Sequence, residues 1–229
     1  MDSRTRVLRA SAPPPQIAAE GDDRPRRRRL AAAARRATIL DAAIPLFASV
    51  GYEQTRMSDV AARVGVTEPV IFQNFGTKAE LFAAALERAS QQAARYLSEM
   101  AAEHANVHDW LCHLLATDHL DHLHTAPMFG VLFADAHRLQ ADATVGAALQ
   151  RSIALAADAM AGMLRRGQVE GAIRADVPAS TLAWLVVSLI QARQFRRTYT
   201  PEPSAVLEAD LLGRIVETFR PETSAYPPA

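Results

Sequence analysis

The sequence of 229 residues has one cysteine and no long apolar run. A single cysteine, Cys112, excludes an internal disulfide, so this side chain is expected to pack as a small hydrophobe. The longest strongly apolar stretch, Leu182 to Ile190, is interrupted by Ser188 and is far shorter than the roughly 20 residues of a membrane-spanning helix. No apolar segment of a secretory signal follows the early arginines. These absences predict a cytoplasmic protein.

Motifs of catalysis and of cofactor binding are also missing. The sequence contains no Gly-rich phosphate loop, no Ser/His/Asp or Cys/His arrangement, and no pair of carboxylates at an interpretable spacing. It has no Cys-x-x-Cys and no His-Glu-x-x-His pattern of a zinc site. We therefore predict neither an enzyme nor a bound cofactor.

What the sequence has in abundance is alanine and leucine, and 49% of its residues are hydrophobic. This composition and length predict an all-α protein with one small and one larger helical domain. The expected order is a disordered arm at residues 1–30, a small domain at 31–80, a larger domain at 81–220 and a flexible tail at 221–229.

Positive charge is concentrated at the N-terminus, although the formal net charge of the chain is zero. From Met1 to Arg36 there are ten arginines against four acids, and residues up to Glu20 offer little apolar surface to bury. Arg27 and Arg28 belong to a run of four arginines just before the first expected helix. They are interpreted as an arm that follows phosphates or enters the minor groove of DNA, the alternative being a solvated tail.

Residues 55–78 carry the pattern of a helix-turn-helix. One short helix is expected from about Thr55 or Ser58 to Val64, ended by Gly65, and a second one is opened by Thr67 with Pro69 in its first turn. The spacing turns five apolar side chains inward and leaves the start of the second helix free to enter a major groove. The inward residues are Val60, Ala61, Val66, Ile71 and Phe75.

The same stretch resembles the DNA-binding domain of the TetR family of bacterial transcriptional repressors, over roughly Arg35 to Ala89. This resemblance implies that the larger domain binds a small-molecule effector and forms a homodimer, and that the protein leaves a palindromic operator when the effector binds. The matching residues are Leu46-Phe47, Gly51-Tyr52, Thr55, Val60-Ala61, Val64-Gly65-Val66-Thr67, Ile71-Phe72, Phe75 and Lys78-Ala79-Glu80-Leu81.

Two kinds of DNA contact are predicted. Thr55, Arg56, Thr67 and Lys78 suit phosphate contacts, through hydroxyl groups, helix N-termini or charge, and such contacts fix the register without reading sequence.

Base reading is assigned to the second helix. Gln73 and Asn74 carry amides that can pair with adenine, and Val70 can pack on a thymine methyl group, although one amide could instead cap the helix end. Phe72 stands where the family usually has tyrosine, so a hydroxyl that commonly reaches phosphate is lost. Glu68 would repel phosphates unless it accepts from a cytosine amine or pairs with Arg63.

The remaining helices are expected from periodicity and punctuation. The first should run from Leu30 to Val50 and end at Gly51, with a kink or break near Asp41 to Ile44 because Pro45 removes a backbone donor. A long helix from Thr77 to about Glu103 should join the two domains. Later helices are expected at about residues 106–124, 127–139, 144–170, 178–198 and 204–219.

The last two of these helices have apolar stripes, which by resemblance to the family form a four-helix bundle with a second subunit. The alternative is an intramolecular core. The predicted interface residues are Leu182, Leu185, Leu189, Leu207, Leu211 and Ile215.

Two interpretations of the larger domain remain open. Large apolar side chains with a few polar ones could line an effector cavity, although each is individually expected in an ordinary core. The alternative is a metal sensor or enzyme using the histidines from His104 to His124, spaced three and four apart. The predicted cavity residues are Trp110, His113, Leu114, Phe129, Phe133, His137, Met160, Met163, Trp184 and Gln191.

Overall fold

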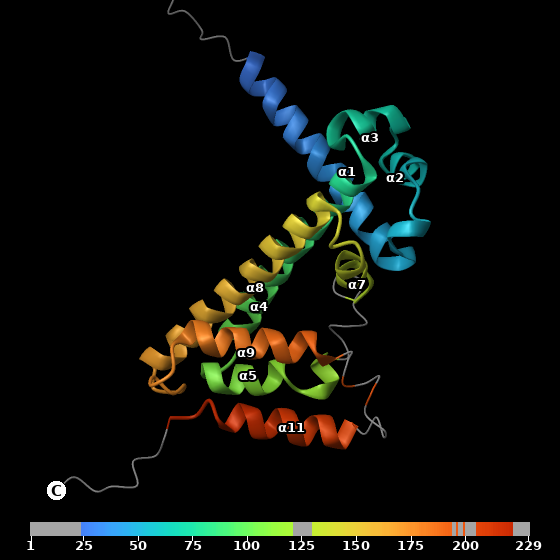
Figure 1. Cartoon of the computed structure of the whole chain (residues 1–229). Coiled ribbons are helices and arrows are strands. Elements are labelled where there is room, and N and C mark those ends of the chain that lie inside the picture. The colour runs from blue at the N-terminus through green and yellow to red at the C-terminus, as the bar shows by residue number, and fades with distance from the viewer. Residues whose placement is uncertain (1–23, 121–129, 194–195, 197–198, 200–204, 222–229) are drawn as a thin grey trace, which may run out of the picture. The chain divides into compact units, whose positions relative to one another are not determined.

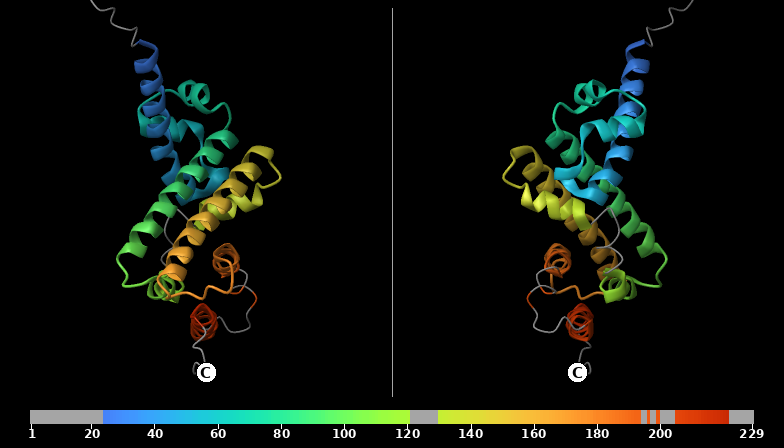
Figure 2. Two further views of the ribbon diagram at one scale, coloured as in Figure 1. Left: turned by 90° about the vertical axis from the view of Figure 1, so that its left-hand side faces the viewer. Right: turned by 90° about the vertical axis from the view of Figure 1, so that its right-hand side faces the viewer.

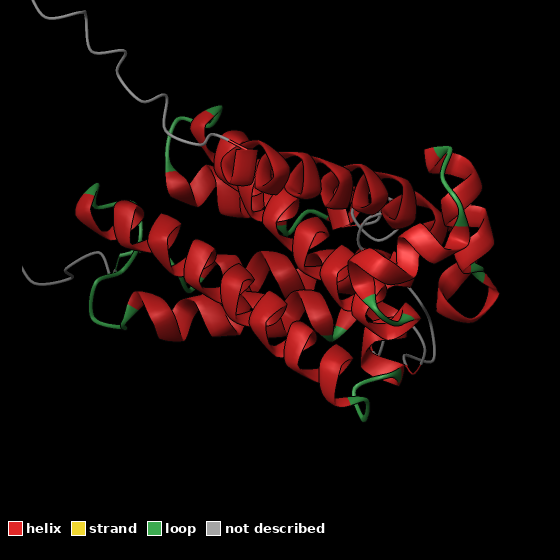
Figure 3. Ribbon diagram, turned by 90° about the horizontal axis from the view of Figure 1, so that it is seen from above, coloured by secondary structure: helices red, strands yellow, loops and turns green. Residues whose placement is uncertain are grey.

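The computed structural model describes residues 24–120, 130–193, 196, 199 and 205–221. Within these ranges the secondary structure is helical and contains no strand, so the predicted all-α fold is confirmed (Figures 1 and 3). No helix in the described part of the chain is long and apolar enough to cross a membrane. The chain divides into two compact units, Met1–Arg35 and Arg36–Ala229.

The first helix, α1 (Arg24–Gln54), begins six residues before the expected Leu30. Its backbone keeps helical dihedral angles through Pro45, so the break predicted near Asp41 to Ile44 is wrong, and the kink of α1 lies at Gly51. Proline frees the carbonyl of Asp41, which is an exposed residue, and water can bond this group. The non-helical dihedral angles lie at Gly51, where φ is 82° and ψ is 172°, values that only glycine adopts easily. The predicted end of the regular helix at Gly51 is therefore confirmed.

Three helices follow in the predicted order. They are α2 (Met57–Val64), α3 (Glu68–Phe75) and α4 (Lys78–Ala102). Thr77 precedes α4 and forms a capping box with Glu80. The Thr77 hydroxyl accepts from the Glu80 backbone N–H, and the Glu80 carboxylate accepts from the Thr77 backbone N–H. This cap fixes the point at which the chain leaves α3.

One apolar core joins the first four helices. Ile39 and Phe47 of α1, Val60 of α2, Ile71 of α3 and Phe82 of α4 are completely buried in it. Leu132, Ala136 and Leu149, from later helices, extend the same core. The helix-turn-helix therefore rests on a rigid support, and α4 continues from it along α8 (Figures 1 and 2).

The later described helices are α5 (Val107–Leu114), α7 (Gly130–Arg138), α8 (Ala143–Val169), α9 (Ala179–Gln191) and α11 (Ala205–Glu217). A second core, around Trp110, Leu164, Ala183 and Phe219, joins α5, α8, α9 and the end of α11 (Figure 2). The helix expected over residues 106–124 is interrupted at Leu115 and Ala116, and the Leu114 and Leu115 side chains at this point are both buried.

Candidate nucleic-acid interface

The turn between α2 and α3 is made by Gly65, which has φ 76° and ψ 32°. The Gly65 N–H donates to Ala62 O at 3.2 Å, and the Val66 N–H donates to Ala61 O at 3.0 Å. These bonds satisfy the last carbonyls of α2 in a left-handed cap and allow α3 to start two residues later. Val60 and Ile71 are fully buried on either side of the turn, as expected.

The N-terminus of α3 is exposed. Thr67 is the N-cap residue in an extended conformation, Pro69 lies in the first turn, and the Thr67 side chain makes no capping hydrogen bond. The first N–H groups of a helix have no partner inside the helix and attract anions. In α3, however, Pro69 has no N–H and the Val70 N–H donates to Thr67 O at 3.0 Å. The Thr67 side chain and the Glu68 N–H are therefore the groups available to a phosphate.

Thr55 does not belong to this exposed set. Its side chain is only 2% exposed, and its hydroxyl donates to Gly51 O at 2.7 Å. The predicted phosphate contact through the Thr55 hydroxyl is therefore wrong, because the group is enclosed and holds the start of α2 to the end of α1. The exposed Arg56, which immediately follows it as the N-cap residue of α2, keeps its predicted place at the interface.

The side-chain amides of α3 differ in availability. The Asn74 Nδ2 donates to Val70 O at 2.7 Å, so this amide is engaged within its own helix. This geometry matches the alternative in which one amide serves the helix end. Gln73 is exposed, Val70 is half-buried, and the Phe72 ring is 40% exposed although it carries no polar group. Gln73 is therefore the better candidate for base reading.

Lys78 and Glu68 also meet different surroundings. The Lys78 Nζ donates to Glu53 O at 3.2 Å and lies 4.5 Å from the centre of the Tyr52 ring, so it connects α4 to the turn after α1. Glu68 is exposed, and the structure records no ion pair between Glu68 and Arg63, both of which lie in its described part. The acidic group thus stands free at the start of α3.

Arg36 was missed by the sequence interpretation, which counted it only as part of a basic arm. Its guanidinium lies 4.1 Å from the centre of the Phe75 ring and donates to Asn74 O at the end of α3. Arg36, Asn74, Phe75, Gly76 and Glu80 line a shallow cavity of about 390 Å³. The sequence signal that could have revealed Arg36 was Phe75, an aromatic residue close to the end of a helix, because an arginine of α1 can stack on such a ring. Arg27 and Arg28 lie in the helical backbone of α1, but their side chains lie outside the described residues.

The described members of the predicted effector set lie in different surroundings. Trp110, Leu114, Met160 and Met163 are buried in the second core. Phe133 packs against the first core instead, and Phe129 lies outside the described residues. The remaining four predictions fall on exposed side chains, namely His113, His137, Trp184 and Gln191. The described members of the set therefore divide between two cores and the surface, and the effector site stays a prediction.

The predicted dimer residues also divide by burial. Leu182 is 6% exposed and contributes to the second core, so it is unavailable to a partner in this structure. Leu189 and Ile215 are half-buried. Leu185, Leu207 and Leu211 are 42%, 53% and 37% exposed, and Trp184 of α9 is 50% exposed.

The histidine alternative finds little support. The rings of His104 and His119 lie 5.1 Å and 4.8 Å, between centres, from the ring of His113. Across the described ranges, however, no three His, Cys, Asp or Glu side chains are arranged to hold a metal ion. His122 and His124 lie outside the described residues.

Comparison with known proteins supports the geometry of α2 and α3. Residues 39–85 match the family model described as bacterial regulatory proteins, tetR family. Over 54 residues the chain is 43% identical to the HTH-type transcriptional activator FasR of Mycolicibacterium smegmatis, a match covering 24% of this chain and 25% of the relative. The match thus spans about a quarter of the length of that relative.

Solved structures extend the likeness to most of the chain. A TetR-family transcriptional regulator from Cytophaga hutchinsonii is 14% identical with a TM-score of 0.65, covering 83% of this chain and 96% of that one. A transcriptional regulator from Saccharomonospora viridis in complex with choline is 21% identical with a TM-score of 0.61, covering 81% and 96%. At these identities the likeness concerns the fold.

Proposed function

Since this chain belongs to the tetR family of bacterial regulatory proteins, we propose that it is a homodimeric transcription regulator, which leaves a palindromic operator when a small molecule binds. The observation that carries this proposal is the exposed N-terminal half of α3, held by the Gly65 turn on a buried apolar support. A DNA partner in a bacterial cell places the protein in the cytoplasm.

Phosphate contacts are assigned to the exposed helix starts. Arg56 caps α2 and Thr67 caps α3, so both lie where backbone N–H groups point out of a helix. Lys78 stays in this set, although it must exchange its bond to Glu53 O for a phosphate oxygen. Such contacts supply affinity and fix the register of the protein on the duplex.

Base reading is assigned chiefly to Gln73, with apolar contacts from Val70 and Phe72. An amide side chain can pair bidentately with adenine, and an exposed ring or methyl group can pack on a thymine methyl. Asn74 must break its bond to Val70 O before it can read a base, so its contribution is smaller. The free Glu68 carboxylate would accept from a cytosine amine rather than approach a phosphate.

Dimerisation is assigned to α9 and α11. Large apolar side chains are rarely exposed together on a monomer without a partner, and Trp184, Leu185, Leu207 and Leu211 are all more than a third exposed. A two-fold dimer would bring two copies of α3 to half-sites about one helical turn of DNA apart. A small molecule that prefers a different spacing of the two α3 helices would then release the DNA, in proportion to its differential affinity.

We assign repression as the output because a dimer seated on a promoter blocks the polymerase by occupancy alone, whereas activation needs an additional productive contact. The FasR relative is named an activator, but its match is confined to 54 residues.

The test is fluorescence anisotropy of the full-length protein on the DNA upstream of its own gene, against a scrambled duplex. We expect selective binding that weakens as salt rises, since binding releases counterions from DNA. Gln73→Ala should cost about 1–3 kcal/mol on the selected duplex and little on the scrambled one. Gln91→Ala, an exposed glutamine on α4, is the matched control and should bind as the wild type does.

Equal affinity for both duplexes, together with an unchanged Gln73→Ala variant, would contradict sequence reading by α3. Before that conclusion, fragments selected from the whole genome should replace the upstream duplex, because an operator elsewhere gives the same first result.

A further inference from the structure

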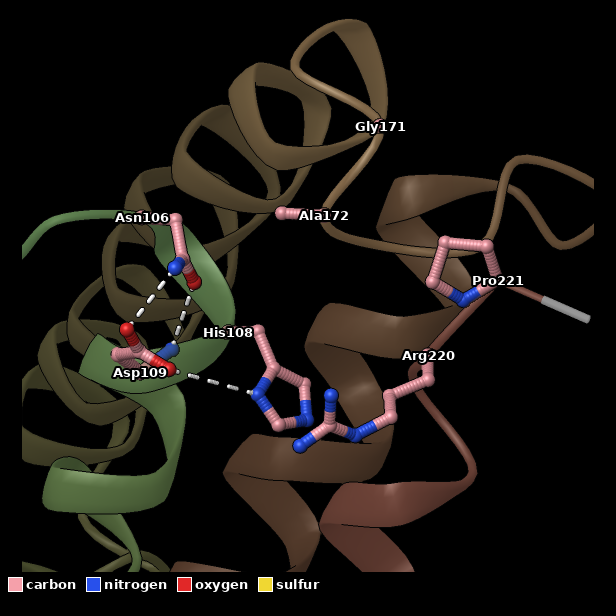
Figure 4. A pocket seen from close by; sticks show the side chains of 7 residues that line it. All are labelled: Asn106, His108, Asp109, Gly171, Ala172, Arg220 and Pro221. Carbon is pink, nitrogen blue, oxygen red and sulfur yellow. Dashed lines mark hydrogen bonds and ion pairs between the residues drawn. The ribbon is translucent and has the colours of Figure 1, made fainter. Parts of the chain in front are cut away.

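A cavity of about 320 Å³ lies between the start of α5, the turn after α8 and the residues that follow α11 (Figure 4). None of its lining residues belongs to the effector set predicted from the sequence. The lining consists of Asn106, His108, Asp109, Gly171, Ala172, Arg220 and Pro221. Its size falls in the range of small-molecule sites in proteins.

His108 is the unusual residue of this cavity. It is only 4% exposed, yet among the residues that the structure describes its buried Nε2 has no hydrogen-bond partner. Buried polar atoms are nearly always bonded, and one left without a partner costs roughly 1–3 kcal/mol. An imidazole held in this way next to a cavity suggests that the missing partner is a ligand.

The other ring nitrogen of His108 indicates what kind of partner is missing. The Nδ1 atom lies 3.6 Å from Cys112 Sγ and 3.9 Å from Asp109 Oδ1. Partial burial, followed by the negative charges of Asp109 and Glu217, raises the pKa of the Cys112 thiol, so the thiol keeps its proton. A protonated thiol can donate to Nδ1, and in that tautomer the ring proton lies on Nε2. Nε2, which lies on the Arg220 side of the ring in Figure 4, is then a donor without an acceptor among the described residues.

Arg220 supplies a positive charge beside this donor. Its guanidinium lies next to the His108 ring in Figure 4, while Asp109 lies on the other side of that ring. The Arg220 Nε donates to Glu217 Oε2 at 2.6 Å, which orients the fork and leaves its terminal amino groups for another acceptor. The Asp109 carboxylate is turned toward Asn106, whose Nδ2 donates to Asp109 Oδ2 at 2.8 Å.

We propose that this cavity binds a small organic monocarboxylate. Its carboxylate accepts from the Arg220 guanidinium and from His108 Nε2, and its short apolar chain lies against Ala172 and Pro221. Arginine forks suit planar carboxylates, and charge-assisted bonds of this kind are roughly twice as strong as neutral ones. A single negative charge fits better than the two charges of a phosphate, because the Asp109 carboxylate lines the same cavity.

The test is isothermal titration of the full-length protein with sodium butyrate, with 1-butanol as the uncharged analogue of the same chain length. We expect saturable binding of butyrate and none of butanol. Arg220→Gln should weaken butyrate binding at least about tenfold, because the charged fork is lost. Arg214→Gln is the matched control, since Arg214 is an exposed arginine of α11 that pairs with Asp210 and does not line the cavity.

His108 is tested by two substitutions. His108→Leu removes the donor and should also weaken butyrate binding, whereas His108→Gln keeps an N–H close to the position of Nε2 and should retain most of it. If circular dichroism shows that His108→Leu does not fold, the surface variant Arg220→Gln still tests whether the cavity binds butyrate.

Three results would overturn the proposal. These are the absence of saturable butyrate binding at millimolar concentrations, equal binding by Arg220→Gln and the wild type, and tighter binding of inorganic phosphate than of butyrate. The titration contains no DNA, so its outcome is independent of whether the protein reads an operator.

Discussion

Thr55 and Thr67 are the same residue type in opposite environments. The Thr55 hydroxyl is buried and bonded to Gly51 O, whereas Thr67 stands exposed at the start of α3 with no capping bond. We expect Thr55→Val to lower the free energy of unfolding by about 1–2 kcal/mol, because the shape is kept and the hydrogen bond is lost. Urea unfolding followed by circular dichroism measures this change.

The companion variant Thr67→Val should leave the free energy of unfolding within about 0.5 kcal/mol of the wild type, as substitutions at exposed positions usually do. It should nevertheless weaken DNA binding, because the hydroxyl that we propose contacts a phosphate is lost. A Thr67→Val protein with wild-type affinity for the selected duplex would remove Thr67 from the interface.

For single residues, the sequence predicts which side chains are chemically able to contact DNA, but it does not predict the surroundings of each side chain in the fold. Thr55, Asn74 and Lys78 were all expected at DNA, but each makes a bond to a backbone carbonyl of its own domain. The Thr55 and Asn74 bonds each reach the carbonyl four residues earlier, as short polar side chains often do. The Lys78 bond joins α4 to the end of α1, so it depends on how the core packs and no local spacing rule predicts it. His108 is similar, since its burial and its unpartnered Nε2 follow from contacts between α5 and distant segments.

Among the elements, the best predicted are those with local signals at both ends. The ends of α2 and α3 were predicted to within about two residues from Gly65, Thr67 and Pro69. Such signals are reliable because caps and turns depend on neighbours in the sequence. The break predicted from Pro45 is wrong, because the burial of Ile39, Ala43 and Phe47 keeps α1 helical although proline lacks a backbone donor. Tertiary packing thus outweighs a local penalty of about 3 kcal/mol.

The contact between α7 and the end of α1 was not predicted. Asp135 of α7 is 2% exposed, accepts from the Tyr52 N–H at 2.5 Å through Oδ2, and pairs with Arg138 through Oδ1. A Cβ on Gly51 would lie 3.0 Å from the same Oδ2, so glycine allows this close approach. The turn that carries Tyr52 leads directly into α2, and Asp135 therefore ties the helix-turn-helix to α7.

We expect Asp135→Ala to leave the Tyr52 N–H buried without an acceptor and to lower the free energy of unfolding by about 1–3 kcal/mol. Hydrogen exchange measured by mass spectrometry should become faster in the segment containing Tyr52 and α2 than in α8 and α9.

The control for Asp135→Ala is Asp210→Ala, which removes an exposed carboxylate paired with Arg214 and should change neither measurement appreciably. A uniform increase of exchange over the whole chain would mean that Asp135 contributes only to general stability.

For the whole molecule, the central expectation is a pair of chains joined through α9 and α11. A charge placed on an exposed leucine of the proposed interface would have to be desolvated when the two chains associate, and this cost exceeds what the lost apolar contact alone would give. Leu207→Asp should therefore shift the mass measured by light scattering from twice the 24.9 kDa of one chain toward a single copy. Val169→Asp is the control, because this valine at the end of α8 is 90% exposed and lies outside the proposed interface.

The same two variants connect assembly to DNA reading. A monomer carries one α3 and can contact one half-site, so it loses the gain that comes from holding two half-sites at once. We expect Leu207→Asp to bind the selected duplex much more weakly than the wild type, and Val169→Asp to bind it equally well. A Leu207→Asp protein that remains at the mass of two copies would place the interface elsewhere, whereas one that is monomeric but binds with full affinity would show that the two-fold arrangement is not needed to read the DNA.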